Sequence, residues 1–215
     1  MTRAELAQQP PNPRLDWPRF PSSTLADGRR LFRAARRSPW WFCACGGCRF
    51  DLRPPRGTCY LGTDPVSALL ESIGVEWTAG RPLSPAFLLQ RRVYTWAVTR
   101  PTRLADLVSR RAVGFNVTNE LSAMTPYAVP QLFAELFDRV LSGRRRAFDG
   151  IRFRTRFDTA PAPRGIALFG DAGLLTAPPS AVRDVDDELV EELGALGVLV
   201  QDPPGLADLD VATDP

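Results

Sequence analysis

The stretch GTCYLGTDPVSALLESIG, residues 57–74, carries the clearest local signal in the chain. Cys59–Leu61 predicts a short strand, rich in residues that favour extended backbone. Asp64 and Pro65 predict the start of a helix, because aspartate caps free backbone N–H groups and proline fits the first helical position. Gly74 is typical of a helix end. The helix between them presents one apolar stripe at helical spacing: Val66, Leu69, Leu70 and Ile73.

Outside this unit, five segments show the patterns of strands or helices. Residues 91–99 alternate like a strand, and residues 148–158 alternate strongly enough to predict a strand that pairs with 164–171. Residues 129–143 and 184–200 have the spacing of amphipathic helices. Because strands and helices are mixed without regular strand–helix–strand alternation, the sequence predicts an α+β fold.

Two of these segments have a predicted inner face. The helix over 129–143 is expected to direct five apolar residues inward: Leu132, Phe133, Leu136, Phe137 and Val140. One face of the strand over 148–158 should hold Ile151, Phe153, Thr155 and Phe157. Its other face should hold Arg152, Arg154 and Arg156.

Composition divides the 215 residues into three parts. Residues 1–27 are rich in proline and polar residues, which predicts an arm that lies on the surface or is partly disordered. Residues 28–183 form the body, and residues 184–215 form an acidic helix and tail. All 27 arginines and 14 acids lie in residues 1–183, a net charge of +13, whereas residues 184–215 carry ten acids and no arginine. The basic part suits an anionic partner, which includes the acidic tail itself lying over a basic cleft.

Two residue types are missing, and their absence excludes several kinds of chemistry. The chain has no lysine and no histidine. It therefore lacks a Walker-A loop, a Schiff-base lysine, a Ser-His-Asp triad and an HExxH zinc helix. No apolar run approaches a membrane span and no secretory signal is present, so we expect a cytoplasmic protein. Any catalysis must use carboxylates, arginine, tyrosine, hydroxyls, thiols or backbone groups.

Several motifs occur in an order that resembles the RES domain family. LFRA at 31–34 is followed by CRFD at 48–51, the unit GTCYLGTDPVSALLES at 57–72, DGIRFRTRFD at 149–158 and IALFGD at 166–171. The resemblance covers roughly residues 28–172. It implies a single ADP-ribosyltransferase-like domain, with central mixed or antiparallel sheets flanked by helices.

The resemblance also implies an activity. RES proteins are typically toxins of bacterial toxin–antitoxin pairs that consume NAD. Some cleave the nicotinamide–ribose bond by phosphorolysis or hydrolysis, and others transfer ADP-ribose to a protein. The expected substrate is NAD, with phosphate as a second substrate of phosphorolysis, and the expected partner is an Xre-like antitoxin. No metal, membrane or nucleic acid is expected.

Six positions carry over from the family motifs or their surroundings. Arg33 and Arg49 match the two family arginines, and Tyr60 and Glu71 match the tyrosine and glutamate of the strand–helix unit. Thr155 stands where the family has serine, which keeps the hydroxyl but adds a methyl group. A further hydroxyl or phenol before the helix at 129–143, from Thr125 or Tyr127, is expected near the same pocket.

These residue types suit cleavage of the nicotinamide–ribose bond. Nicotinamide leaves as a neutral molecule, and the transition state resembles an oxocarbenium ion. Glu71 is the acid placed to steady its positive charge. Arg33 and Arg49 can bind the pyrophosphate with planar bidentate donors. Tyr60 can stack on nicotinamide or bind the ribose. Pattern alone, in contrast, describes Glu71 as a surface glutamate, because it lies off the apolar stripe.

Two other functions compete with this one. The cysteines have the spacing C-x-C-x2-C-x10-C, so Cys43, Cys45, Cys48 and Cys59 form a candidate four-thiolate zinc set around Gly46-Gly47. The simpler interpretation is a group of small buried side chains. The aromatic run Trp40, Trp41 and Phe42 beside Arg36 and Arg37 would suit nucleic-acid binding, although no complete motif supports it.

Overall fold

An eight-stranded mixed sheet forms the centre of the computed structural model, which describes residues 8–78, 80–158 and 165–202. Its strands stand in the order β1 (Ser22–Leu25), β6 (Thr102–Asp106), β9 (Gly150–Phe153), β10 (Gly165–Asp171), β4 (Arg56–Gly62), β2 (Arg30–Ala35), β5 (Arg92–Ala97) and β12 (Ala181–Asp184). β6 and β9 pair in parallel and the other neighbours pair antiparallel. Two small pairs accompany this sheet: β3 (Trp41–Phe42) with β11 (Gly173–Leu174), and β7 (Leu141–Ser142) with β8 (Arg145–Arg146). The predicted α+β class is confirmed.

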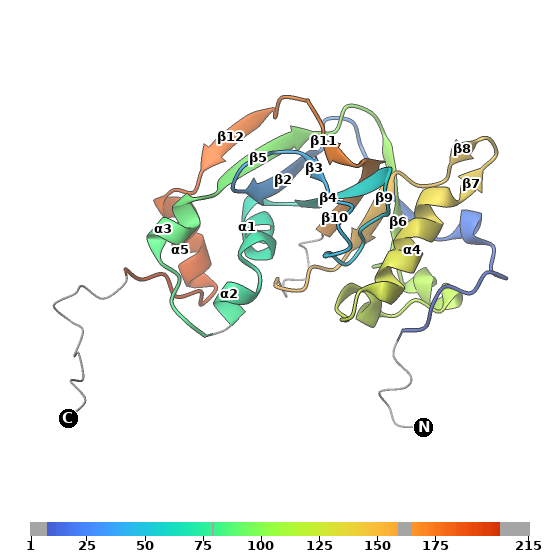
Figure 1. Cartoon of the computed structure of the whole chain (residues 1–215), viewed down its shortest axis with the longest axis horizontal. Coiled ribbons are helices and arrows are strands. Elements are labelled where there is room, and N and C mark those ends of the chain that lie inside the picture. Colours follow the sequence, from blue (N-terminus) through green and yellow to red (C-terminus); the bar gives the residue numbers. More distant parts are fainter. Residues whose placement is uncertain (1–7, 79, 159–164, 203–215) are drawn as a thin grey trace, which may run out of the picture.

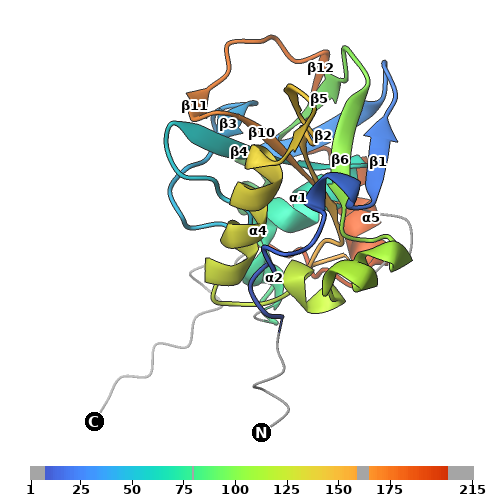
Figure 2. The same ribbon diagram turned by 90° about the vertical axis from the view of Figure 1, so that its right-hand side faces the viewer.

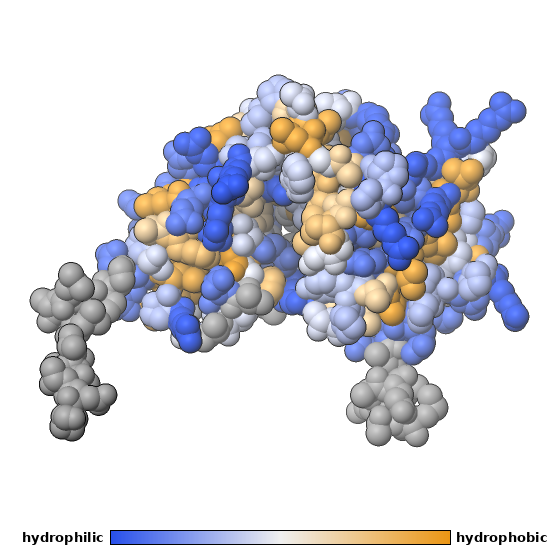
Figure 3. Space-filling model, viewed as in Figure 1, coloured by the Kyte–Doolittle hydropathy of each residue, from blue (hydrophilic) through white to orange (hydrophobic). Residues whose placement is uncertain are grey.

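Two groups of helices lie under this sheet, at opposite ends of it (Figure 1). One group contains α1 (Pro65–Ile73), α2 (Val75–Thr78), α3 (Pro85–Leu89) and α5 (Asp187–Ala195). The other contains α4 (Ala128–Arg139) and the short 3-10 helices η2 (Trp17–Arg19), η3 (Arg110–Phe115) and η4 (Asn119–Ser122). Between the groups the surface is hollowed (Figure 3). No helix of the described segments is long and apolar enough to cross a membrane.

Three apolar clusters make up the core. The cluster at α4 is rich in phenylalanine and the cluster at α1 and α5 is aliphatic. The third cluster packs on the opposite face of the sheet. β10 shows the division, because Ile166 and Leu168 belong to the third cluster while Ala167 between them belongs to the α4 cluster.

The strand–helix unit at 57–74 follows its prediction closely. β4 contains the predicted strand and extends it in both directions. The Asp64 side chain accepts a hydrogen bond from the Ser67 backbone N–H at 2.8 Å, and Pro65 is the first helical residue. Gly74 caps the C-terminus with a φ of 52°, in the left-handed region that favours glycine. Leu69, Leu70 and Ile73 are buried as predicted.

The predicted N-terminal arm is wrong for residues 17–25. Trp17 and Phe20 are 3% and 1% exposed and stack within the α4 cluster, with 5.7 Å between their ring centres. β1 then pairs with β6 at the outer edge of the sheet, as Figure 2 shows. Residues 1–7 lie outside the described residues. The proposed domain boundaries stay a prediction, but these contacts tie residues 17–25 to the body.

Two predicted elements end earlier than expected. The helix over 129–143 ends at Arg139, and the chain continues into the β7–β8 pair. Its inward residues Phe133 and Phe137 are buried, but Leu132 is 40% exposed, so its predicted inward direction is wrong. The strand over 148–158 stops at Phe153, although it pairs with β10 as predicted.

The C-terminal segment is also more integrated than its composition suggested. β12 pairs with β5, and α5 spans 187–195 where a helix over 184–200 was predicted. Val185, Leu189 and Leu193 are buried in the α1 cluster. Residues 184–200 therefore belong to the fold, and residues 203–215 lie outside the described residues.

Candidate functional site

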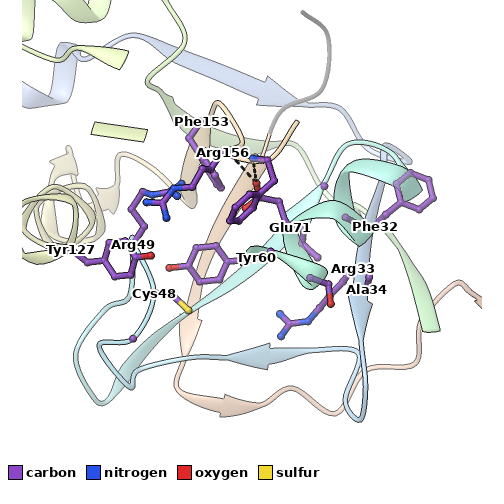
Figure 4. A pocket seen from close by; sticks show the side chains of 18 residues that line it. Phe32, Arg33, Ala34, Cys48, Arg49, Tyr60, Glu71, Tyr127, Phe153 and Arg156 are labelled. Carbon is purple, nitrogen blue, oxygen red and sulfur yellow. Dashed lines mark hydrogen bonds between the residues drawn. The ribbon is translucent and has the colours of Figure 1, made fainter. Parts of the chain in front are cut away.

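A cavity of about 370 Å³ opens between the two helix groups. It lies between β2 and β4. These two strands pair at a single position, Phe32 with Gly62, and separate beyond it. The next residues of both strands, including Arg33 and Tyr60, line the cavity. α1, the loop before β4 and the turn after β9 complete its walls (Figure 4).

Glu71 reaches this cavity from α1. Gly62 allows the start of α1 to lie against β4, because a Cβ there would stand 2.8 Å from the Ala68 backbone nitrogen. The apolar stripe of α1 faces the core, so Glu71 on its flank faces the open side. Glu71 Oε1 accepts hydrogen bonds from the backbone N–H groups of Arg156, at 2.9 Å, and Phe157, at 3.2 Å. The carboxylate thus fixes the turn after β9 while lining the cavity.

Arg49 is the most unusual charged residue of the site. Its side chain is buried, with 8% of the residue exposed, and its Nε has no hydrogen-bond partner. The guanidinium lies 6.0 Å from the ring centre of Phe50 and 5.9 Å from that of Phe153, and it forms no ion pair with any described residue. Burial, and next the charge of Arg156, lower the pKa of Arg49. The charge of Glu71 acts in the opposite direction but makes no ion-pair contact with Arg49. Burying a cation without such a contact is costly, so this position favours an anion from outside the chain.

Two more guanidinium groups line the cavity. Arg33 Nη1 donates to the carbonyl of Trp41 at 3.2 Å and to Cys59 Sγ at 3.0 Å. Arg156 Nη2 donates to the carbonyl of Ala123 at 2.8 Å, and its guanidinium lies 5.9 Å from the ring centre of Tyr127. Three cations around one cavity repel one another, and a bound polyanion relieves that repulsion.

Tyr60 presents its ring to the cavity, whereas its hydroxyl is engaged by the protein. The hydroxyl donates to Asp51 Oδ1 at 3.0 Å and accepts from the Phe50 backbone N–H at 2.8 Å. Burial, together with the charge of Asp51, raises the pKa of Tyr60 well above its usual range. Of the two roles expected for Tyr60, stacking of the ring on a planar ligand fits these contacts better than binding of the ribose.

The structure brings together four of the six predicted site residues: Arg33, Arg49, Tyr60 and Glu71. Thr155 is buried and does not line the cavity, and its Oγ1 donates to the Asp158 carbonyl at 3.2 Å. Thr125 is exposed and does not line the cavity, but Tyr127, named as its alternative, does.

Arg156 and Phe157 also line the cavity, and the sequence did not indicate them. The alternation over 148–158 placed Arg156 on the face away from Phe153. Because the strand ends at Phe153, the following residues turn, and Arg156 comes to the cavity instead. The run of three alternating arginines is the signal that could have suggested an anion site.

The four cysteines do not converge on one point. Cys59 is 1% exposed in β4 and accepts a hydrogen bond from Arg33, so the candidate four-thiolate set is not assembled. Cys43 and Cys45 instead lie beside Asp51, and Cys48 lines the cavity. The aromatic run suggested for nucleic-acid binding does not form a stacking surface, because Trp40 and Phe42 are buried and only Trp41 is exposed.

This architecture is shared with a chain of known structure. A chain in the crystal structure of the M. tuberculosis MbcT–MbcA toxin–antitoxin complex matches with a TM-score of 0.54 and 16% identity, over 80% of this chain and 92% of that chain. At this identity the similarity concerns the fold. A family model described as the RES domain matches residues 29–189. The chain belongs to the RES domain family, and the suspected relationship is confirmed. No curated protein gives a significant match.

Proposed function

We propose that this RES protein cleaves the nicotinamide–ribose bond of NAD at the cavity between the two helix groups. The observation that carries this proposal is the placement of the Glu71 carboxylate and the unpaired, buried Arg49 guanidinium in one cavity. The cavity volume, about 370 Å³, falls within the range of small-molecule sites. Family membership supports an NAD-utilising enzyme, and the geometry supports the roles given below.

The pyrophosphate of NAD is the group that would bind the three arginines of the cavity. Guanidinium groups bind phosphate oxygens with two parallel hydrogen bonds, because their planar donors match the spacing of those oxygens. Arg49 offers donors that no described carboxylate occupies. Arg33 and Arg156 keep one anchor each on backbone carbonyls, which fixes their position while leaving other N–H groups for the ligand.

The carboxylate of Glu71 and the rings of Tyr60 and Phe157 suit the nicotinamide–ribose end of NAD. Nicotinamide takes the electrons of the breaking C–N bond and leaves as a neutral molecule, while positive charge develops on the ribose. Glu71 Oε1 is engaged by the turn after β9, and Oε2 has no hydrogen-bond partner within the described part of the chain. Oε2 is therefore the atom that we assign to the ribose. The rings of Tyr60 and Phe157 offer stacking faces for nicotinamide.

The proposed biological role is that of a toxin. The similar solved chain belongs to a toxin–antitoxin complex. By analogy, we expect an antitoxin partner for this chain and growth arrest when it is expressed alone. Depletion of NAD explains such an arrest without any contact to nucleic acid or membrane.

Product analysis tests the proposed reaction. The purified protein is incubated with NAD, with and without inorganic phosphate. Phosphorolysis yields nicotinamide and a phosphorylated ADP-ribose only when phosphate is present, because a phosphate oxygen attacks the anomeric carbon of the ribose as nicotinamide leaves. Hydrolysis yields nicotinamide and ADP-ribose in either case, and transfer to a protein yields nicotinamide with a modified polypeptide. Intact NAD under all of these conditions would refute the proposal.

A further inference from the structure

A second group of ligand atoms lies next to the cavity, in the segment between β3 and β4. The Sγ atoms of Cys43 and Cys45 and a carboxylate oxygen of Asp51 all lie within 4.8 Å of one another. Cys43 Sγ stands 2.7 Å from Cys45 Sγ, and Cys45 Sγ stands 3.4 Å from Asp51 Oδ2. Ligand atoms of a tetrahedral zinc are roughly 3.3–3.8 Å apart at the usual bond lengths. The distance from Cys45 Sγ to Asp51 Oδ2, 3.4 Å, falls within this range. The two sulfurs, at 2.7 Å, would have to move apart by about 1 Å through side-chain rotation to bind the same ion.

A glycine turn holds the backbone close to the sulfur of Cys45. The turn Cys45-Gly46-Gly47-Cys48 has Gly46 at a φ of 73°, in the left-handed region, and the Gly47 N–H donates to Cys45 Sγ at 3.4 Å. A Cβ at Gly47 would stand 3.2 Å from that sulfur, so the close approach suits glycine. This turn therefore fixes the position of one proposed ligand atom.

Asp51 distinguishes this arrangement from the four-thiolate set considered from the sequence. It is 2% exposed, and its Oδ2 also accepts from the Cys48 backbone N–H at 3.0 Å. We propose that Cys43, Cys45 and Asp51 bind a divalent transition metal of the zinc type. The fourth position is left to water or to the thiol of Cys48. Binding displaces the two thiol protons, so two thiolates and one carboxylate face a dication and leave one net negative charge.

The metal would stabilise the segment that presents the cavity residues. Between β3 and β4 the chain forms no helix or strand, apart from the bridge of Cys43 to Thr58. Asp51 Oδ1 holds the Tyr60 hydroxyl, and Arg49 lies two residues before Asp51. A metal bound through Oδ2 leaves Oδ1 with Tyr60 and fixes the segment that carries Arg49. This inference concerns the metal alone and does not depend on NAD cleavage.

Cobalt titration tests this site with a readout separate from activity. The full chain is freed of metal with a chelator under a phosphine reductant and then titrated with Co²⁺, which gives a thiolate-to-cobalt charge-transfer band when cysteines ligate it. We expect about one equivalent to bind, and zinc to displace it. Cys45→Ser changes an exposed thiol conservatively and should weaken binding at least about tenfold. Asp51→Asn should weaken it similarly, with circular dichroism confirming that the variant is folded.

Cys59→Ser is the matched control, because this thiol lies outside the cluster and should leave the cobalt band intact. Absence of the band in the wild type would overturn the proposal, as would equal binding by the wild type and Cys45→Ser. Loss of NAD cleavage with an intact cobalt band would count against the proposed function and leave the metal site standing.

Discussion

Glu71 is hydrogen-bonded to the backbone of Arg156, with 2.9 Å between Glu71 Oε1 and the Arg156 nitrogen. The two residues are far apart in sequence, and this bond connects α1 to the turn after β9. It places a carboxylate and a guanidinium in the walls of one cavity. Glu71 holds this turn, and under the proposed function it also presents a negative charge to the ligand; mutation can separate the two roles.

Glu71→Gln should separate them. Glutamine keeps an oxygen that accepts from the Arg156 and Phe157 N–H groups but loses the charge that stabilises an oxocarbenium-like transition state. We expect kcat for NAD cleavage to fall by about 100-fold or more while the melting temperature changes little. Glu191→Gln, an exposed position on α5, is the matched control and should leave kcat unchanged. An equal kcat in wild type and Glu71→Gln would remove Glu71 from the site.

Arg49→Met should preserve or improve stability and impair binding. Methionine fills similar space and removes a buried guanidinium that has no carboxylate partner among the described residues. We expect the melting temperature to stay the same or rise, and KM for NAD to rise at least about tenfold as a charge-assisted contact is lost. Thermal unfolding and steady-state kinetics measure both. Arg144→Met, at an exposed position, should change neither. A destabilised Arg49→Met with unchanged KM would show that Arg49 is structural.

Tyr60→Phe should lower stability and leave NAD cleavage nearly unchanged, which is the opposite of the effect expected for Arg49→Met. The ring that lines the cavity is kept, but Asp51 and the Phe50 N–H each lose a partner. We expect the free energy of unfolding to fall by about 1–3 kcal/mol and kcat/KM to change only a few-fold. Chemical denaturation and NAD turnover provide the two values. A large loss of kcat/KM with normal stability would mean that the hydroxyl binds the ligand.

The C-terminal segment allows a test of its two parts. Deleting residues 184–215 removes buried Val185, Leu189 and Leu193, and the loss of each leucine alone is worth about 2–5 kcal/mol, so this variant should not fold. Deleting only residues 203–215 spares them. The sequence-based hypothesis that the acidic tail covers the basic cleft then predicts faster NAD turnover by the shorter deletion. Equal turnover would argue against the hypothesis.

The sequence was most informative where structure is decided locally. Asp64, Pro65 and Gly74 determine the limits of α1 through capping and backbone geometry, and both limits were predicted correctly. The order of the family motifs along the chain allowed Arg33 and Glu71 to be predicted as site residues. They lie on different elements, and both line the cavity.

Features that depend on contacts between distant segments were not predictable in this way. The proline-rich composition around Trp17 and Phe20 concealed their burial, because it depends on α4 more than a hundred residues later. Alternation cannot show where a strand ends, so Arg156 was assigned to the wrong side. Counting thiols likewise missed Asp51, which only the folded chain brings to Cys43 and Cys45.

Cleavage of NAD at the Glu71 cavity is tested most directly by measuring the release of free nicotinamide from NAD by the wild-type protein and by Glu71→Gln under identical conditions. We expect the wild type to release nicotinamide, and a Glu71→Gln protein of unchanged melting temperature to release it at a rate lower by about 100-fold or more. No nicotinamide from the folded wild type, or equal release by the two proteins, would contradict it.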